Sequence, residues 1–346
     1  MKTTFFPACL ILLAVAVAIA AGSVSTASAR PSGDQLVGAG SSFVSPLVSL
    51  WQSDYPSKTG VQIIYAPIGS GGGIAAITGR TVDFGASDAP LSPDQFAACK
   101  GCEQIPWALG GTSIMVNVKT NAHAPLKVSG PVLALIYLGA IKTWNAPAIQ
   151  KLNPGISLPN ESIVPVYRSD GSGTSFNFTD YLSAISSAWK SKIGISTQPA
   201  FPTGVGAKGS SGVAGVVSKT EGAIGYADIA FAIKNHIPVM AVKNAAGKYL
   251  TPGIKSIAAA ASTIKRVPVN NEVHIVNPPK SQPGAYPICT FTYVIVPVQT
   301  SKAPLLKKFI FYALTQGQSF GVKLRFVPIP KVILVAAEKT LNKIHT

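Results

Sequence analysis

The chain has 346 residues, 47% hydrophobic and only 12% charged, so it is long enough for two folded domains and is not a disordered protein. Its net charge of +16 reflects 29 Lys and Arg against only 13 Asp and Glu. The basic residues are scattered apart from pairs such as Lys265-Arg266, whereas nucleic-acid binders gather them in runs or on one face, so the composition argues against a nucleic-acid partner.

The first residues have the pattern of a secretory signal peptide. Lys2 precedes an apolar run at 5–21, and small residues ending at Ala29 are typical of a cleavage site. We therefore expect residues 1–29 to be removed and the mature protein to be soluble and periplasmic. Cys9 lies too early for a lipoprotein anchor.

Beyond this segment, β-rich runs alternate with helical patterns, which predicts an α/β fold. The expected elements in chain order are a strand at 37–40, a helix at 46–55, a strand at 61–65, a glycine-rich turn at 69–73, a helix at 74–79, strands at 84–86 and 113–118, helices at 133–137 and 176–182, a strand at 291–296, and helices at 302–315 and 331–344.

The cysteines of the mature chain favour a structural role. Cys99 and Cys102 are close enough in sequence to form a local disulfide in an oxidising compartment. A redox pair or half of a zinc site is the alternative, but a zinc site needs two further ligands. We expect Cys289 to be a buried free thiol in an apolar strand, and we expect no metal site and no cofactor.

Four clusters of Gly, Ser and Thr interrupt the alternation, and three of them precede a predicted helix. A helix N-terminus offers unpaired N–H groups and the positive end of its dipole, and glycines let an anion approach the backbone. Ordinary helix caps and turns use the same residues, so one cluster alone does not establish a site. The clusters lie at 38–43, 68–73, 83–88 and 168–175.

Three charged residues in these clusters sharpen the prediction of an oxyanion site. The guanidinium of Arg168 is suited to paired hydrogen bonds with an oxyanion, and Asp170 is placed to hold it; a surface ion pair is the alternative. Asp88 can accept a hydrogen bond from phosphate, which keeps a proton near neutral pH, but repels sulfate, which has none. A helix cap is the alternative role for Asp88.

These segments resemble the periplasmic phosphate-binding proteins of ABC importers, over nearly the whole mature chain. The most specific matches are TVDFGASDAPLS at 81–92 and RSDGSGTSFNFTDYL at 168–182. Shorter matches are GAGSSF at 38–43, IGSGGG at 68–73, EGAIGYADIAFA at 221–232 and YPICTFTYVIV at 286–296.

The resemblance implies a two-lobed periplasmic-binding-protein fold of type II-like topology, with hinge strands between an α/β lobe at 30–112 plus 286–346 and another at 113–285. It implies a monomeric, non-enzymatic receptor that binds inorganic phosphate between the lobes and delivers it to permease subunits in the inner membrane. The implied phosphate contacts are Ser42, Phe43, Ser70 and Asp88 of lobe one and Arg168, Ser172, Gly173 and Thr174 of lobe two, with Asp170 and Gly71 in support.

The family more often has Thr where Ser42 stands and Ser where Gly71 stands, although a hydroxyl and an N–H group remain at these positions. The alternatives are a receptor for another tetrahedral oxyanion, a scavenger without a permease, and a secreted phosphatase, which would need more metal-binding carboxylates or histidines.

Two short sequence motifs match known functional patterns but lack the surrounding features that those functions require. Ser319 lies in a G-x-S-x-G pattern but follows a predicted helix, so it does not fit a hydrolase nucleophile. The glycines at 204, 206 and 209 spell a dinucleotide-binding pattern, but the acidic partner comes too early, and we expect a loop there.

Overall fold

The structure is a computed structural model that describes residues 34–346, so the expected signal peptide at 1–29 lies outside the described residues. Strands and helices alternate, as the α/β prediction requires. The strands are β1 Gln35–Gly40, β2 Gln62–Ala66, β3 Phe84–Ser87, β4 Cys102–Asn117, β5 Lys127–Val128, β6 Val164–Arg168, β7 Val205–Ala207, β8 Ala223–Asp228, β9 Ala241–Lys243, β10 Tyr249–Leu250 and β11 Cys289–Pro297. The helices are α1 Ser45–Thr59, α2 Ser70–Thr78, α3 Pro93–Cys99, α4 Gly130–Tyr137, α5 Pro147–Gln150, α6 Gly173–Ile185, α7 Ser187–Lys192, α8 Gly209–Lys219, α9 Ile229–Lys234, α10 Ile254–Ala261, α11 Ala303–Leu314, the 3-10 helix η1 Gln316–Leu324 and α12 Lys331–Leu341.

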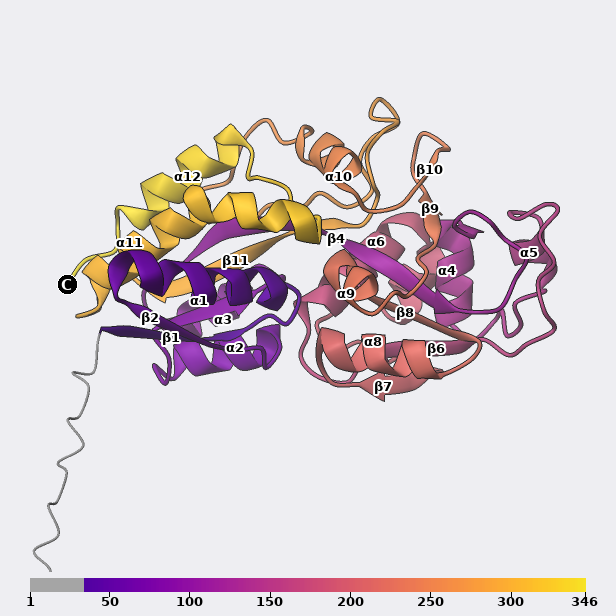
Figure 1. Cartoon of the computed structure of the whole chain (residues 1–346), viewed down its shortest axis with the longest axis horizontal. Coiled ribbons are helices and arrows are strands. Elements are labelled where there is room, and N and C mark those ends of the chain that lie inside the picture. The colour runs from indigo at the N-terminus through magenta and orange to yellow at the C-terminus, as the bar shows by residue number, and fades with distance from the viewer. Residues whose placement is uncertain (1–33) are drawn as a thin grey trace, which may run out of the picture. The chain divides into compact units, whose positions relative to one another are not determined.

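A long sheet in the order β2-β1-β3-β11-β4-β8-β6-β7 runs through the described chain (Figure 1). β4 joins its two parts, because residues 102–111 pair with β11 and residues 112–117 pair with β8, both antiparallel. We call the part containing β2, β1, β3 and β11 the first sheet half, and the part containing β8, β6 and β7 the second sheet half. A smaller sheet has the order β10-β9-β5.

Each sheet half has helices on both faces and its own aromatic core. In Figure 1, α1, α11 and α12 lie above β1 and β2, and α2 lies below them. The rings of Trp51, Trp107 and Phe309 meet in the first half, with Trp51 and Trp107 centroids 5.1 Å apart. In the second half, Phe178 stacks on Tyr226 with centroids 4.4 Å apart. These two aromatic groups belong to different buried clusters, which is consistent with two lobes.

Both sheet halves contain a parallel set of strands, and the carboxyl ends of these strands position the candidate site. β1 pairs in parallel with β2 and β3, and β6 pairs in parallel with β7 and β8. Ser41 follows β1, Asp88 follows β3, Arg168 ends β6 and Gly209 lies two residues beyond the end of β7. Ligands of open α/β sheets bind beyond these ends, so the topology places the polar clusters where a site is expected.

The glycine-rich turn expected at 69–73 is wrong in part, because α2 already begins at Ser70. Glycine is a poor helix former, but a close approach of backbones explains its presence here. A Cβ on Gly73 would lie 2.4 Å from the Cα of Gly40, and one on Gly71 would lie 3.1 Å from the Cα of Gly171. The first turn of α2 is therefore packed directly against the end of β1 and the loop after β6.

The loop expected at 204–209 is also wrong in part, since only residues 204 and 208 are irregular. The segment forms the short edge strand β7, parallel to β6, and α8 begins at Gly209. The sequence does not predict β7, because three residues are too few to show the alternation of a strand. The pairing with β6 determines this strand.

The cysteine predictions are confirmed. Cys99 and Cys102 form a disulfide, and the guanidinium of Arg80 lies against it, donating to Cys99 O at 2.8 Å. Cys289 is a buried free thiol in β11, and burial raises its pKa. None of the helices between residues 34 and 346 is both long and apolar enough to span a bilayer.

Candidate functional site

The turn between β1 and α1 brings two serines and the backbone N–H of Phe43 to the site. Ser42 is buried, and its Oγ lies 3.0 Å from Ser210 Oγ and accepts the Ser210 N–H at 3.0 Å. The N–H of Phe43 donates to Ser41 Oγ at 3.1 Å. An anion bound at this turn would have to share the Phe43 N–H with that hydroxyl or take it over.

The start of α2 supplies the second predicted contact group. Ser70 is buried, and its Oγ accepts the N–H of Asp88 at 3.2 Å, so its own proton remains available for another acceptor. The N–H of Gly71 donates to Gly171 O at 2.9 Å. This last bond joins the first sheet half directly to the loop after β6.

Asp88 is the buried carboxylate of the site, with only 2% of its surface exposed. One oxygen, Oδ1, accepts from Ser41 Oγ, and the other, Oδ2, accepts from Thr174 Oγ1 at 3.1 Å. Burial raises the pKa of Asp88 to about 6, against the hydrogen bond from Ser41 and the charge of Arg168. The carboxyl group is therefore mostly ionised at neutral pH and accepts hydrogen bonds.

Arg168 and Asp170 form a paired salt bridge at the end of β6. The Nε of Arg168 donates to Asp170 Oδ1 at 2.7 Å, and one terminal nitrogen donates to Oδ2 at 2.5 Å. The other terminal nitrogen lies 3.4 Å from both Thr174 Oγ1 and Ser210 Oγ. The Asp170 carboxylate thus holds one edge of the guanidinium, and the other terminal nitrogen faces the hydroxyl groups of the site.

Burial alone would raise the pKa of Asp170, but the hydrogen bonds and charge of Arg168 and the N–H of Gly209 together hold it below its ordinary value. Asp170 is therefore ionised at neutral pH, as the orienting role requires.

The N-terminus of α6 completes the second side of the site. Ser172 caps the helix, since its Oγ accepts the Ser175 N–H at 3.0 Å. A Cβ on Gly173 would lie 2.6 Å from the backbone nitrogen of Asp88 and from Ser70 Oγ. Only glycine allows the start of α6 to come this close to the first sheet half. The predicted phosphate contacts of the two sheet halves therefore lie together.

The structure adds residues that the sequence did not single out. Ser41 and Ser210 are fully buried, and each bonds to a predicted site residue. Gly209 donates its N–H to Asp170 Oδ1 at 2.9 Å with φ of +71°. Ser41 lay beside Ser42 in a cluster that sequence analysis had already marked, whereas Ser210 became visible only through its contact with Ser42, 168 positions away.

Other groups with possible chemistry lie outside this site. Ser319 is exposed in η1 and donates to Gln316 O at 2.8 Å, so it is not placed as a hydrolase nucleophile. Within residues 34–346, no group of three or more His, Cys, Asp or Glu side chains is arranged to hold a metal ion.

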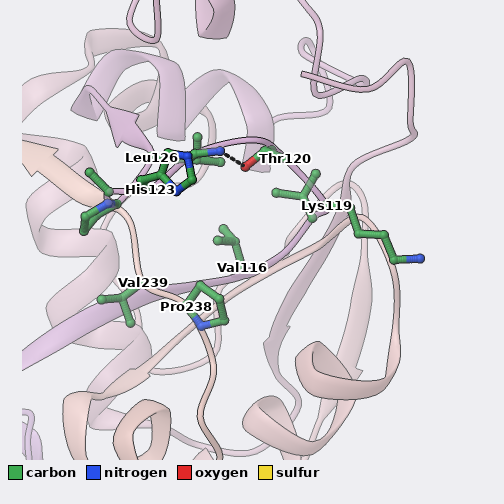
Figure 2. Close-up of a pocket in the computed structure, with 11 residues that line it drawn as sticks. Val116, Lys119, Thr120, His123, Leu126, Pro238 and Val239 are labelled. Carbon is green, nitrogen blue, oxygen red and sulfur yellow. Dashed lines mark hydrogen bonds between the residues drawn. The ribbon is translucent and has the colours of Figure 1, made fainter. Parts of the chain in front are cut away.

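A separate cavity of about 520 Å³ lies between the end of β4 and the loop that follows it (Figure 2). Its walls are mostly apolar, and the ammonium of Lys119 points away from it, toward Glu221 at 2.9 Å. The oxyanion donors described above do not reach this cavity. The labelled lining residues are Val116, Lys119, Thr120, His123, Leu126, Pro238 and Val239.

Comparisons with known proteins agree with this geometry. Residues 25–316 match the family described as PBP superfamily domain. A protein of Xylella fastidiosa named phosphate-binding protein PstS is 42% identical over 299 residues, covering 86% of this chain and 82% of the relative. A protein of the same name from Pasteurella multocida is 38% identical, covering 90% of both chains.

A solved structure of a phosphate-binding protein from Stenotrophomonas maltophilia superposes with a TM-score of 0.70. It is 19% identical and covers 88% of this chain and 93% of the other, so it supports the two-lobed fold alone.

Proposed function

The chain belongs to the PBP superfamily and, within it, to the PstS phosphate-binding proteins, and from this premise we propose that it binds inorganic phosphate outside the cytoplasm and delivers it to an ABC importer. The observation that carries the proposal is the buried carboxylate of Asp88, set among hydrogen-bond donors from both sheet halves. A site built only of donors would accept any tetrahedral oxyanion, whereas an accepting carboxylate requires a ligand that still bears a proton.

The proposed contacts are those that meet at the carboxyl ends of the parallel strands. Ser42, Phe43 and Ser70 would donate from the first sheet half, and Asp88 would accept the ligand's proton. Arg168 would pair with the phosphate oxygens while Asp170 and Gly71 hold the surrounding loops, and the start of α6 would donate as well. The α6 donors in this proposal are Ser172, Gly173 and Thr174.

We propose that lobe one spans 30–112 plus 286–346 and that lobe two spans 113–285. The change of β4 pairing partner between Gly111 and Thr112 supports the first boundary. Tyr286 lies at the second boundary, and its hydroxyl donates to Thr112 O at 2.8 Å, so the two crossing points are side by side. A ligand bound by both lobes would favour their closed arrangement through a hinge at these crossings.

The remaining parts of the proposal concern the protein's cellular setting. A signal peptide cleaved near Ala29 would deliver a soluble monomer to the periplasm, where the closed form would dock on permease subunits of the inner membrane. The relatives are named for phosphate binding and not for a reaction, which supports a receptor over an enzyme.

The proposal is tested by calorimetric titration of the mature protein with phosphate and with sulfate. We expect phosphate to bind at least about 100-fold more tightly, since leaving a buried charge unpaired costs about 3 kcal/mol or more. Equal affinities would contradict the role of Asp88, and no phosphate binding would refute the function.

The variant Asp88→Asn removes the carboxylate charge and keeps the side-chain size. It should lose most of the preference for phosphate while its melting curve stays close to that of the wild type. The matched control Asp94→Asn makes the same change at an exposed position in the first turn of α3 and should leave both affinities unchanged.

A further inference from the structure

Ser41 is the fully buried serine that links the turn after β1 to the carboxylate of the site. Its Oγ accepts two backbone hydrogen bonds, from Phe43 N at 3.1 Å and from Val44 N at 3.4 Å. A serine hydroxyl has two acceptor lone pairs and one proton. Because an ionised carboxylate can only accept, the single proton of the Ser41 hydroxyl is donated to Asp88 Oδ1.

The backbone of Ser41 is held as firmly as its side chain. Its N–H donates to Ala86 O at 2.8 Å, and its carbonyl accepts from the hydroxyl of Tyr65 at 2.7 Å. Contacts on the N–H, the carbonyl and the hydroxyl leave Ser41 one orientation, so its proton points at a fixed place.

The two oxygens of Asp88 consequently serve different sides of the molecule. Oδ1 is bonded within the first sheet half, to Ser41, and Oδ2 faces the start of α6, where Thr174 donates to it at 3.1 Å. Anchoring one oxygen prevents the carboxyl group from rotating away from the site, and it leaves the other oxygen facing the place where a ligand would bridge the lobes.

We propose that Ser41 is a positioning residue whose hydroxyl fixes the carboxylate of Asp88 as a hydrogen-bond acceptor and so sets the preference for proton-bearing phosphate over fully deprotonated oxyanions. This inference rests on the proposed phosphate-binding function and assigns part of its selectivity to a residue outside the contact set.

The charge state of Asp88 supports this assignment. Burial raises the pKa of Asp88 to about 6, and among the effects that oppose burial the hydrogen bond from Ser41 is the largest, ahead of the charge of Arg168 and the hydrogen bond from Thr174. Without the Ser41 hydroxyl the carboxyl would keep its proton at higher pH. A protonated Asp88 donates a hydrogen bond, which sulfate can accept.

Other titratable groups also act on Asp88. Burial raises the pKa of Asp228 well above its ordinary value, and the nearby carboxylate of Asp88 raises it further. The titratable and charged side chains near Asp88 include Tyr65 of β2, Arg168 and Asp170 at the end of β6, and Asp228 at the end of β8. Asp180 of α6 and His274 line a small cavity together with Asp88.

The test compares Ser41→Ala with the wild type by calorimetry with phosphate and with sulfate, from pH 5 to pH 9. At pH 7 we expect the ratio of phosphate to sulfate affinity to fall about tenfold, the effect of one hydrogen bond to a charged group. The pH below which the wild type loses its preference should lie near 6, and in the variant it should move upward. A residue that only stabilised the fold would not move this pH profile.

Two further variants keep the test decisive. Ser183→Ala removes another buried hydroxyl, one without a hydrogen-bond partner within residues 34–346, and should change neither the ratio nor the profile. Ser41→Cys keeps a side chain of similar size with a weaker hydrogen-bond donor. Its ratio of phosphate to sulfate affinity should lie between those of the wild type and Ser41→Ala. This variant provides the test if Ser41→Ala does not fold.

The failures of the two proposals can be told apart. A wild type that prefers phosphate, with Ser41 variants that keep its ratio and profile, overturns the role of Ser41 alone. An equal loss of affinity for both anions also overturns it, because that result indicates a general contribution to the site. A wild type that does not bind phosphate overturns the proposed function and this inference with it.

Discussion

Replacing Asp170 by Asn should destabilise the ligand-free protein through the charge that it leaves on Arg168. The guanidinium side chain is 1% exposed and the carboxylate 12%, and two hydrogen bonds of 2.7 and 2.5 Å join them. Asn keeps one acceptor oxygen but no charge, so the buried guanidinium loses its counter-ion and one of the two bonds. The carboxylate also accepts the N–H of Gly209 at 2.9 Å, which the amide satisfies less well.

The expected cost follows from this burial. Removing one partner of a buried ion pair costs about 3–5 kcal/mol, because the remaining charge is desolvated without compensation. Since the amide oxygen of Asn retains part of the contact, we expect a loss near the lower end, about 3 kcal/mol of unfolding free energy. Saturating phosphate should narrow the difference in unfolding free energy between the wild type and Asp170→Asn, because the bound anion would neutralise the charge of Arg168.

The assay is equilibrium urea unfolding at pH 7, followed by tryptophan fluorescence and circular dichroism, first without phosphate and then with phosphate in excess. The matched control is Glu221→Gln, which removes the acid of an exposed pair with Lys119 whose side chains are 54% and 84% exposed, and which should cost less than about 1 kcal/mol. If Asp170→Asn lowers the unfolding free energy no more than this control does, the salt bridge between Arg168 and Asp170 does not stabilise the fold as its burial indicates.

Two other predictions test the close contact of Gly173 with the first sheet half and the ion pairs of His274 with Asp180 and Glu272. Gly173→Ala should weaken phosphate binding at least tenfold, a loss of about 1.4 kcal/mol or more, since its Cβ would lie 2.6 Å from the backbone nitrogen of Asp88 and would hold the lobes apart; a titration that matches the wild type would contradict this. The pKa of His274 is raised to about 9, chiefly by its hydrogen bond to Asp180, so its stabilising effect is complete below its ordinary value of 6.5 and is lost as the pH rises through about 9. In His274→Gln the urea midpoint should therefore fall less than in the wild type between pH 6 and pH 10, and equal falls would refute the assignment.

Most of the fold was predictable because hydrophobic periodicity survives in the elements that cover the cores. The predicted helix at 46–55 is the central part of α1, and the one at 331–344 contains α12. These helices present apolar residues at regular spacing to a buried face, which is a local signal.

The long strand β4 shows where local signals fail. The sequence predicted a strand only at 113–118, whereas β4 begins at Cys102. Pro106 obscures its first part, since proline normally interrupts a strand. The register shift opposite Thr292 and Tyr293, which skips Trp107, marks a bulge that accommodates the proline.

The candidate site was predictable in its parts but not in its connections. Runs of Gly, Ser and Thr before helices are visible in any sequence, and Arg168 and Asp170 are neighbours in the chain. The contacts of Ser42 with Ser210 and of Asp88 with Thr174 span 168 and 86 positions, and only the folded structure brings them together. Ser41 was overlooked for the same reason, because its role depends on a carboxylate 47 positions away.

These long-range bonds link selectivity to lobe closure. Besides the Ser42 contact with Ser210, the described halves are joined by bonds from Gly71 to Gly171 and from Thr174 to Asp88. Bonds of this kind contribute about 1 kcal/mol each, and they act beside further bonds between the proposed lobes, such as the one from Asn177 Nδ2 to Cys289 O at 2.9 Å. Hydrogen bonds to a charged ligand contribute about 1.5–3 kcal/mol each, so a bound anion would dominate the balance. On the proposed function, Asp88 would discriminate against sulfate only while it is desolvated, and an opening of the lobes would return it to water. An anion that Asp88 repels, such as sulfate, would therefore fail to close the lobes. The protein would reject sulfate because the closed state could not form around it.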